Sequence, residues 1–194
     1  HRPSTRPGLD TPRLITPGTE DGGRMIQFEE FVLAAATADL ADAHTDAARA
    51  HADAVEFRMD LADEPLAALE EYDGPLPVIA TNRADWEGGE AGPEGRLAAL
   101  ETAAEHPSVG AVDLELQALA NDPAAQATLD HAADHDAAVI VSVHDFEGTP
   151  RAEELAELLA SAAAAGDVGK LAVTAESLDD ALRLLSVTHA MAGE

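Results

Sequence analysis

The stretch AAVIVSVHDFEGTPRAEELAELLASAAAAGDVGKLAVTA, residues 137–175, decides the fold. Apolar runs at 137–144 and 170–175 flank a segment of helical composition at 151–165. Two short apolar runs joined by a helix predict a β-α-β unit with parallel strands. Pro150 lies where the helix is expected to begin, and proline is tolerated there. We therefore expect two neighbouring parallel strands with a helix packed outside them.

The same alternation runs through most of the chain. Further apolar runs lie at 31–36, 54–61, 76–81 and 111–116, and further helical segments lie at 42–53, 65–72, 93–106, 123–135 and 177–192. Six such units predict an α/β fold with a parallel sheet. Both a doubly wound sheet and a (β/α)8 barrel fit. The barrel is favoured, because no strand is followed by a glycine-rich phosphate loop and because charged residues lie in the strands or at their C-terminal ends.

The domain organisation follows from the same pattern. Residues 1–24 are rich in Pro, Gly, Thr and Arg and show no periodicity, so we expect a disordered N-terminal extension. Residues 25–194 are expected to form the barrel domain. A complete barrel needs eight βα units, and the sequence supplies six. We therefore expect a C-terminally truncated barrel or an open one that needs a partner.

The charge balance is extreme, with 38 acidic residues against 11 basic residues and a net charge of −27. Such a surface repels nucleic acid and anionic membranes, so we expect neither as a partner. Molar salt would screen this self-repulsion, because the Debye length then falls to about 3 Å. The acidity and the scarcity of aromatic residues and lysine therefore predict a cytoplasmic protein. We expect its source to be a salt-accumulating halophile of archaeal type.

Two absences narrow the classes of site and of protein. The sequence contains no cysteine, which excludes disulfides and cysteine-ligated metal centres. It contains no run of about 18 apolar residues, so we expect no membrane-spanning helix.

The only lysine, Lys170, lies within a predicted strand. His144 ends the preceding predicted strand and shares a face with Ser142, because strand side chains alternate. Lys170 and His144 can therefore approach each other across adjacent strands. We expect low-dielectric walls and nearby cations to favour the neutral amine of the lysine. That amine can attack a ketone to give a Schiff base, and a neighbouring histidine can then remove an α-proton. The alternative is a chance surface lysine.

Other charged residues mark two earlier strands. Glu56, Arg58 and Asp60 alternate along one predicted strand, so we expect them to share a face. They form either a structural ion-pair ladder or a substrate site that contains an arginine, because unpaired buried charge is costly. Arg83 ends the next strand. It is either a clamp for a substrate carboxylate, which guanidinium holds through two parallel hydrogen bonds, or a solvated loop arginine.

Two acids mark the strand after that. Asp113 and Glu115 also share a face, because one residue separates them. They form either a polar network inside the barrel or a catalytic pair. The structural network is favoured.

Five segments carry a resemblance to a known family. They are EFRMD at 56–60, TNRADWEGG at 81–89, DLEL at 113–116, SVHDFEGTP at 142–150 and GKLAV at 169–173. In this order they resemble the type I 3-dehydroquinate dehydratases, (β/α)8 barrels of the shikimate pathway and aromatic amino-acid biosynthesis. The segments at 142–150 and 169–173 are the most specific of the five.

The resemblance implies roles for six residues. Lys170 would form an imine with the C3 ketone of 3-dehydroquinate. His144 would remove the C2 proton and return a proton to the departing C1 hydroxyl, which yields 3-dehydroshikimate. Glu87 would pair with this histidine. Three residues match substrate-binding positions: Glu56, Arg58 and Arg83.

The resemblance also implies that the reaction needs no metal and no organic cofactor, and that the protein is a homodimer. Two alternatives to this reading stay open. One is another Schiff-base barrel enzyme of class I, such as an aldolase, which would share the lysine. The other is a truncated, non-catalytic remnant that retains the motifs by descent.

Overall fold

The structure is a computed structural model that describes residue 26 and residues 28–192. The extension predicted at 1–24 lies outside these residues. Within the described residues, none of the helices combines the length and the apolar character needed to cross a membrane.

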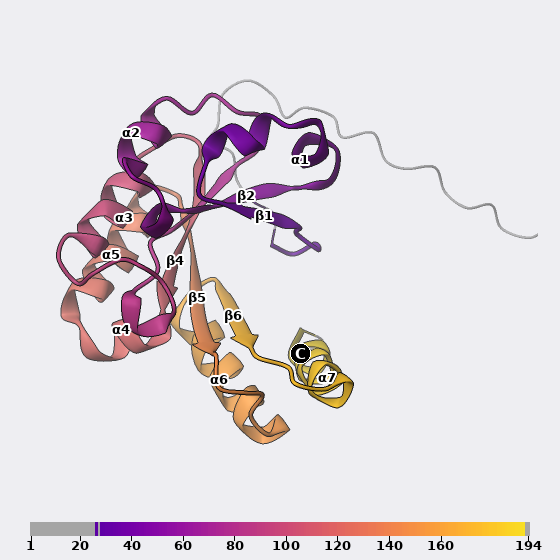
Figure 1. The fold of residues 1–194 in the computed structure, drawn as a ribbon. Helices are drawn as coiled ribbons and strands as arrows, with labels where there is room; N and C mark the ends of the chain where they lie inside the picture. The colour runs from indigo at the N-terminus through magenta and orange to yellow at the C-terminus, as the bar shows by residue number, and fades with distance from the viewer. Residues whose placement is uncertain (1–25, 27, 193–194) are drawn as a thin grey trace, which may run out of the picture.

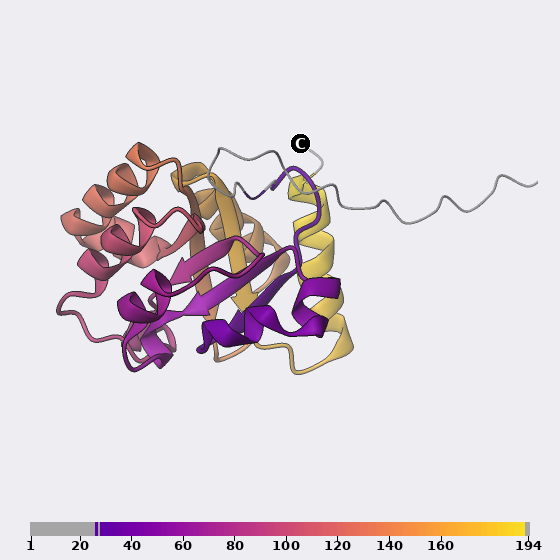
Figure 2. The same ribbon diagram turned by 90° about the horizontal axis from the view of Figure 1, so that it is seen from above.

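Six parallel strands form one sheet, and their order in the sheet is their order in the chain (Figure 1). The strands are β1 (Ala34–Thr37), β2 (Ala54–Arg58), β3 (Val78–Thr81), β4 (Val109–Glu115), β5 (Ala138–Asp145) and β6 (Val168–Val173). Each neighbouring pair is parallel. The sheet curls like part of a barrel wall, and β1 and β6 form its two edges within the described residues (Figures 1 and 2). The predicted α/β class and the six βα units are confirmed.

The helices connect successive strands, except the last one, which follows β6. They are α1 (Asp46–His51), α2 (Pro65–Glu70), α3 (Arg96–Ala104), α4 (Leu116–Asn121), α5 (Pro123–Asp134), α6 (Ala152–Ala165) and α7 (Leu178–Ala192), with the short 3-10 helices η1 (Leu40–His44), η2 (Met59–Leu61) and η3 (Asp85–Glu87). Pro65 and Pro123 occupy the first turns of α2 and α5, as expected of proline near helix starts.

Capping residues explain two differences from the predicted helices: one predicted segment divides into two helices, and one helix is additional. The segment predicted at 42–53 divides into η1 and α1, because the Thr45 side chain accepts a hydrogen bond from Ala48 N and starts a new helix. The sequence did not predict α4, which follows β4 directly. It ends where the Asp122 side chain accepts a bond from Ala124 N and caps α5.

The two faces of the sheet have different chemistry. The outer face carries buried apolar side chains, including Phe57 and Leu114, that belong to the same core as Leu100 of α3. The opposite face, called the inner face below, is apolar only near the N-terminal ends of the strands. There Ile79 and Ile140 pack together with small residues. Further along the same strands the inner face becomes polar, which places charged side chains toward the C-terminal ends.

Candidate active site

Lys170 lies on the inner face between two carboxylates. Its Nζ donates to Glu56 Oε1 at 2.9 Å and to Asp113 Oδ2 at 3.0 Å. Thr81 Oγ1 also donates to Glu56 Oε1, at 3.0 Å, and holds that carboxylate from β3. We call Lys170, Glu56 and Asp113 the lysine network. About a third of the lysine side chain (32%) is exposed, so the amine remains open to a ligand.

The neighbours of Lys170 favour its charged form. Burial alone would lower the pKa of this amine, but the negative charges of Asp113 and Glu56 outweigh burial and raise the pKa above its ordinary value. The expectation that nearby cations favour the neutral amine is therefore wrong for this state of the protein. The reason is that the groups within bonding distance of Nζ are carboxylates.

Asp113 is the buried centre of the site. Its Oδ1 accepts from Ser142 Oγ at 2.6 Å and from Arg83 Nη2 at 2.8 Å, while Oδ2 faces Lys170. Burial alone would raise the pKa of this carboxyl, but the positive charges of Lys170 and Arg83 hold it below its ordinary value. Asp113 is therefore an anion fixed by three strands, in direct contact with the lysine. The sequence placed it on the correct face, but favoured a purely structural role.

A second group of charges lies behind the first. Arg83 Nη1 lies 3.3 Å from Glu115 Oε1, and Arg96 Nη1 donates to Glu115 Oε2 at 2.8 Å. Glu115 Oε1 also accepts from Ala84 N. We call Arg83, Arg96 and Glu115 the arginine network. Its side chains are almost completely buried, and within the described residues every buried side-chain polar atom has a partner.

The structure places Arg83 inside this network, and its side chain is only 4% exposed. Its guanidinium bonds to Asp113 and Ser142 and lies beside Glu115. It is therefore not the solvated loop residue that was one alternative, while its role as a clamp for a substrate carboxylate stays a prediction. This geometry fits an arginine that orients other side chains.

His144, at the C-terminal end of β5, pairs with Glu87. The imidazole Nδ1 lies 2.8 Å from Glu87 Oε1, and the His144 backbone N donates to the same oxygen at 3.0 Å. An ionised carboxylate can only accept, so the proton is assigned to Nδ1 and the lone pair to Nε2. Both side chains are mostly buried. The histidine is thus held in the tautomer that leaves Nε2 available as a base.

Two glycines directly after Glu87 allow the tight course of its loop. Gly88 has a left-handed φ of 78°, and a Cβ there would lie 2.3 Å from the Phe146 ring. At Gly89 a Cβ would lie 2.0 Å from Arg83 O. A larger residue at position 89 would therefore collide with the backbone at Arg83, and one at position 88 would adopt a strained backbone and displace the Phe146 ring. Phe146, which follows β5 and is exposed, lies with its ring nearly parallel to that of His144.

Arg58 ends β2 and turns toward Asp60. Its Nε and Nη2 donate to the two Asp60 oxygens at 2.8 and 2.6 Å. The predicted shared face of Glu56, Arg58 and Asp60 is wrong at Asp60, because the strand ends at Arg58 and Asp60 lies in η2. About a quarter of the Arg58 side chain is exposed at the C-terminal end of the sheet.

Together these groups could perform imine chemistry. Ser142 is in register with Lys170, and His144 lies two residues further along the same face of β5. The site therefore combines one amine, anions that can stabilise a cation on it, and an oriented histidine on the adjacent strand.

Comparisons with known proteins agree with this description. Residues 31–194 match the family model for type I 3-dehydroquinase. A 3-dehydroquinate dehydratase of Halobacterium salinarum is 53% identical over 167 residues, which span 84% of this chain and 73% of the relative. One from Haloarcula marismortui is 54% identical over 172 residues, or 87% of this chain and 74% of the relative.

Solved structures give the same result. The 3-dehydroquinate dehydratase of Geobacillus kaustophilus superposes with a TM-score of 0.71 at 27% identity, over 85% of this chain and 70% of that chain. The enzyme of Enterococcus faecalis gives a TM-score of 0.72 at 25% identity, over 88% and 78% respectively.

Proposed function

This chain belongs to the type I 3-dehydroquinase family, and we propose that it dehydrates 3-dehydroquinate to 3-dehydroshikimate, a step of the shikimate pathway, through an imine on Lys170. The observation that carries the proposal is the position of the only lysine of the chain. Lys170 lies on the inner face, next to the strand that carries His144, and Glu87 orients that histidine. The family match decides against an aldolase-like Schiff-base barrel.

The first step joins the amine to the substrate. Lys170 Nζ loses a proton to solvent and attacks the C3 carbonyl carbon. The carbonyl oxygen takes one proton from the attacking amine and one from solvent, and leaves as water. The product is a protonated imine, which is again a cation at Nζ. Asp113 and Glu56 hold a cation there before the reaction. We propose that the same two carboxylates stabilise the iminium and so maintain it as an electron sink.

The second step removes water from the substrate. His144 Nε2 takes the C2 proton, and the C2–H electrons move into the iminium to give an enamine. The protonated histidine then gives this proton to the C1 hydroxyl, which leaves as water. At the same time the C1–C2 double bond forms and the enamine returns to the iminium. Glu87 stabilises the imidazolium through Nδ1. Hydrolysis of the iminium releases the product and restores the amine.

We assign substrate contacts to Glu56 and Arg58. Both side chains are partly exposed on the inner face, and Arg58 lies at the C-terminal end where barrel enzymes bind substrates. Arg83 also matches a family substrate-binding position. Its 4% exposure supports a role through Asp113 and Ser142, which it orients for Lys170.

We also propose that the protein works in the cytoplasm of a halophile. The net charge of −27 supports this, as do the relatives from Halobacterium salinarum and Haloarcula marismortui. Experiments on the chain therefore belong in molar KCl, where the surface charge is screened.

Borohydride trapping tests the proposed imine. The chain is incubated with 3-dehydroquinate in molar KCl and reduced, and the adduct is located by peptide mass mapping. We expect one adduct, on Lys170, because it is the only lysine. Peptide mapping distinguishes it from the N-terminal amine, the other primary amine of the chain. A Lys170→Arg variant serves as the control and should give none. Folded protein that shows no adduct would contradict the proposal and favour a non-catalytic remnant.

A further inference from the structure

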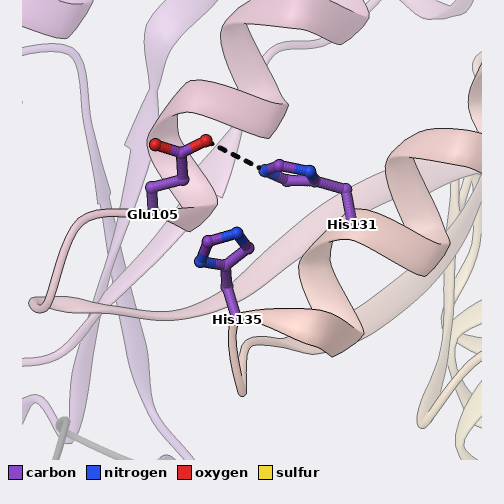
Figure 3. Close-up of side chains that lie close together, drawn as sticks. All are labelled: Glu105, His131 and His135. Carbon is purple, nitrogen blue, oxygen red and sulfur yellow. Dashed lines mark hydrogen bonds and ion pairs between the residues drawn. The ribbon is translucent and has the colours of Figure 1, made fainter.

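A second cluster of potential ligands lies near the N-terminal ends of the strands, whereas the site above lies toward their C-terminal ends. Glu105 follows α3, while His131 and His135 lie on the last turn and at the C-cap of α5 (Figure 3). These helices lead into the N-terminal ends of β4 and β5, whereas His144 lies at the C-terminal end of β5. The proposed dehydration makes no use of this cluster.

The three side chains converge on one point, as Figure 3 shows. One ligand atom from each residue lies within 4.8 Å of the ligand atoms of the other two. His131 Nε2 is 3.2 Å from Glu105 Oε1, and the centroids of the two imidazole rings are 4.5 Å apart. Two imidazole rings therefore lie close together beside a carboxylate, on a surface that ligands can reach.

The backbone that carries the cluster is well fixed. Ala137 N donates to Ala132 O and Asp136 N donates to Ala133 O, which together close α5 as a Schellman motif around His135. One turn earlier, Thr128 Oγ1 donates to Glu101 Oε1 at 2.9 Å and ties α5 to α3. These bonds therefore fix the backbone positions from which Glu105 and the two histidines extend.

We propose that Glu105, His131 and His135 bind one divalent transition-metal ion of the Zn²⁺ class, with water as the fourth ligand. Imidazole nitrogen suits Zn²⁺, Cu²⁺ and Ni²⁺, whereas Mg²⁺ prefers oxygen ligands. Two histidines four residues apart near a helix end present their rings to one point, as in helical zinc sites. The ion links α3 to α5 beside the turns that enter β4 and β5, and so adds stability to a junction that the Thr128–Glu101 hydrogen bond already holds.

The observed distances fit a site that closes around an ion. Tetrahedral Zn²⁺ with bonds of about 2.0–2.1 Å needs ligand atoms about 3.3 Å apart. The Glu105–His131 pair already has this spacing, at 3.2 Å. His135 is exposed, so rotation of its side chain can bring its nitrogen inward by the remaining distance.

Calorimetric titration with Zn²⁺ tests the proposal on the full chain. The titration uses molar potassium nitrate, because chloride itself coordinates Zn²⁺. We expect a 1:1 site that a His131→Gln/His135→Gln double variant weakens by more than about 100-fold, since loss of even an outer-shell partner typically costs about 10–100-fold. His189→Gln, which removes an exposed helical histidine elsewhere, should leave the Kd unchanged.

Thermal unfolding supplies a second readout. At one hundred times the measured Kd, Zn²⁺ should raise the Tm of the unaltered chain by about 5–10 °C and leave the Tm of the double variant unchanged. A Glu105→Gln variant should bind with intermediate affinity. Absence of a site on the unaltered chain would overturn the proposal, as would equal affinity in the double variant. The Lys170 chemistry is independent of either result.

Discussion

Two ion networks meet at Asp113, one open to a ligand and one buried behind it, and their cations differ in what they can do. The cation of the lysine network is an amine on a side chain that is about one-third exposed. The cations of the arginine network are guanidinium groups, and their side chains are at most 6% exposed. Guanidinium stays protonated in proteins, whereas an amine can lose a proton and become a nucleophile. The comparison teaches that similar ion pairs on one sheet can serve chemistry in one place and support in another.

Asp113 connects the two networks through different oxygens. Its Oδ1 bonds to Arg83 and Ser142, and its Oδ2 bonds to Lys170. The buried arginine therefore fixes the orientation of the carboxylate that faces the amine. This arrangement explains why a fully buried network lies directly behind an open site.

Replacing Lys170 should have the largest effect on activity. Lys170→Arg keeps a cation between Asp113 and Glu56 but cannot form an imine. We expect turnover to fall by about 10⁴-fold or more, as for loss of other covalent nucleophiles, with little change in the free energy of unfolding. Steady-state assays and denaturant unfolding of the same samples measure both. An active Lys170→Arg variant would remove the distinction between the two networks.

Replacing His144 should separate the two chemical steps. His144→Ala should still form the imine with 3-dehydroquinate, while dehydration slows by about 10²–10⁴-fold. Borohydride trapping measures the imine, and the appearance of the conjugated product measures dehydration. His51→Ala, at an exposed position on α1, is the matched control. Full turnover in His144→Ala would show that another group moves the proton.

Breaking the arginine network should lower stability instead of changing the chemistry. Arg96→Met leaves Glu115 buried with one cation fewer, so the free energy of unfolding should fall by about 3–5 kcal/mol. Arg49→Met removes an exposed helical arginine and should change it by less than about 0.5 kcal/mol. Denaturant unfolding in molar KCl compares them. Equal effects in the two variants would argue against a supporting role for the network.

Changing Glu56 should shift a pH profile. Carboxylates raise the pKa of Lys170, so the neutral amine forms only at high pH, and Glu56→Gln should lower that pKa. The rate of imine formation should then reach half its alkaline maximum at a lower pH than in the unaltered chain. Single-turnover trapping at saturating substrate measures it, with exposed Glu157→Gln as the control. A shift of this profile toward higher pH would contradict the claim that Glu56 raises the pKa of Lys170.

Much of the fold could be predicted from the sequence, because apolar runs and helical segments alternate clearly. The parallel sheet and its six units follow from that alternation. Exact bounds could not be predicted where capping decides them, as at Thr45 and Asp122. The first strand was predicted at 31–36, but β1 spans Ala34–Thr37. Phe31 lies before the strand and is exposed.

The candidate site was predictable by residue but not by partner. Alternation placed Glu56, Asp113 and His144 on the inner face, and the motifs pointed to Glu87. Which groups would contact Lys170 depends on how strands far apart in the chain stagger, because Glu56 and Asp113 reach it from β2 and β4. The carboxylates around the amine could therefore not be predicted from the sequence. Because they were missed, the expected direction of the Lys170 pKa shift was wrong.

The most direct test of the account is the pKa of Lys170 itself. The chain has one lysine, so protein labelled with ¹³C at lysine Cε gives one NMR signal to follow against pH. We predict a pKa above the ordinary value of about 10.4, and a lower value in Glu56→Gln. A pKa below the ordinary value in the folded, unaltered chain would contradict the claim that Asp113 and Glu56 hold Lys170 as a cation.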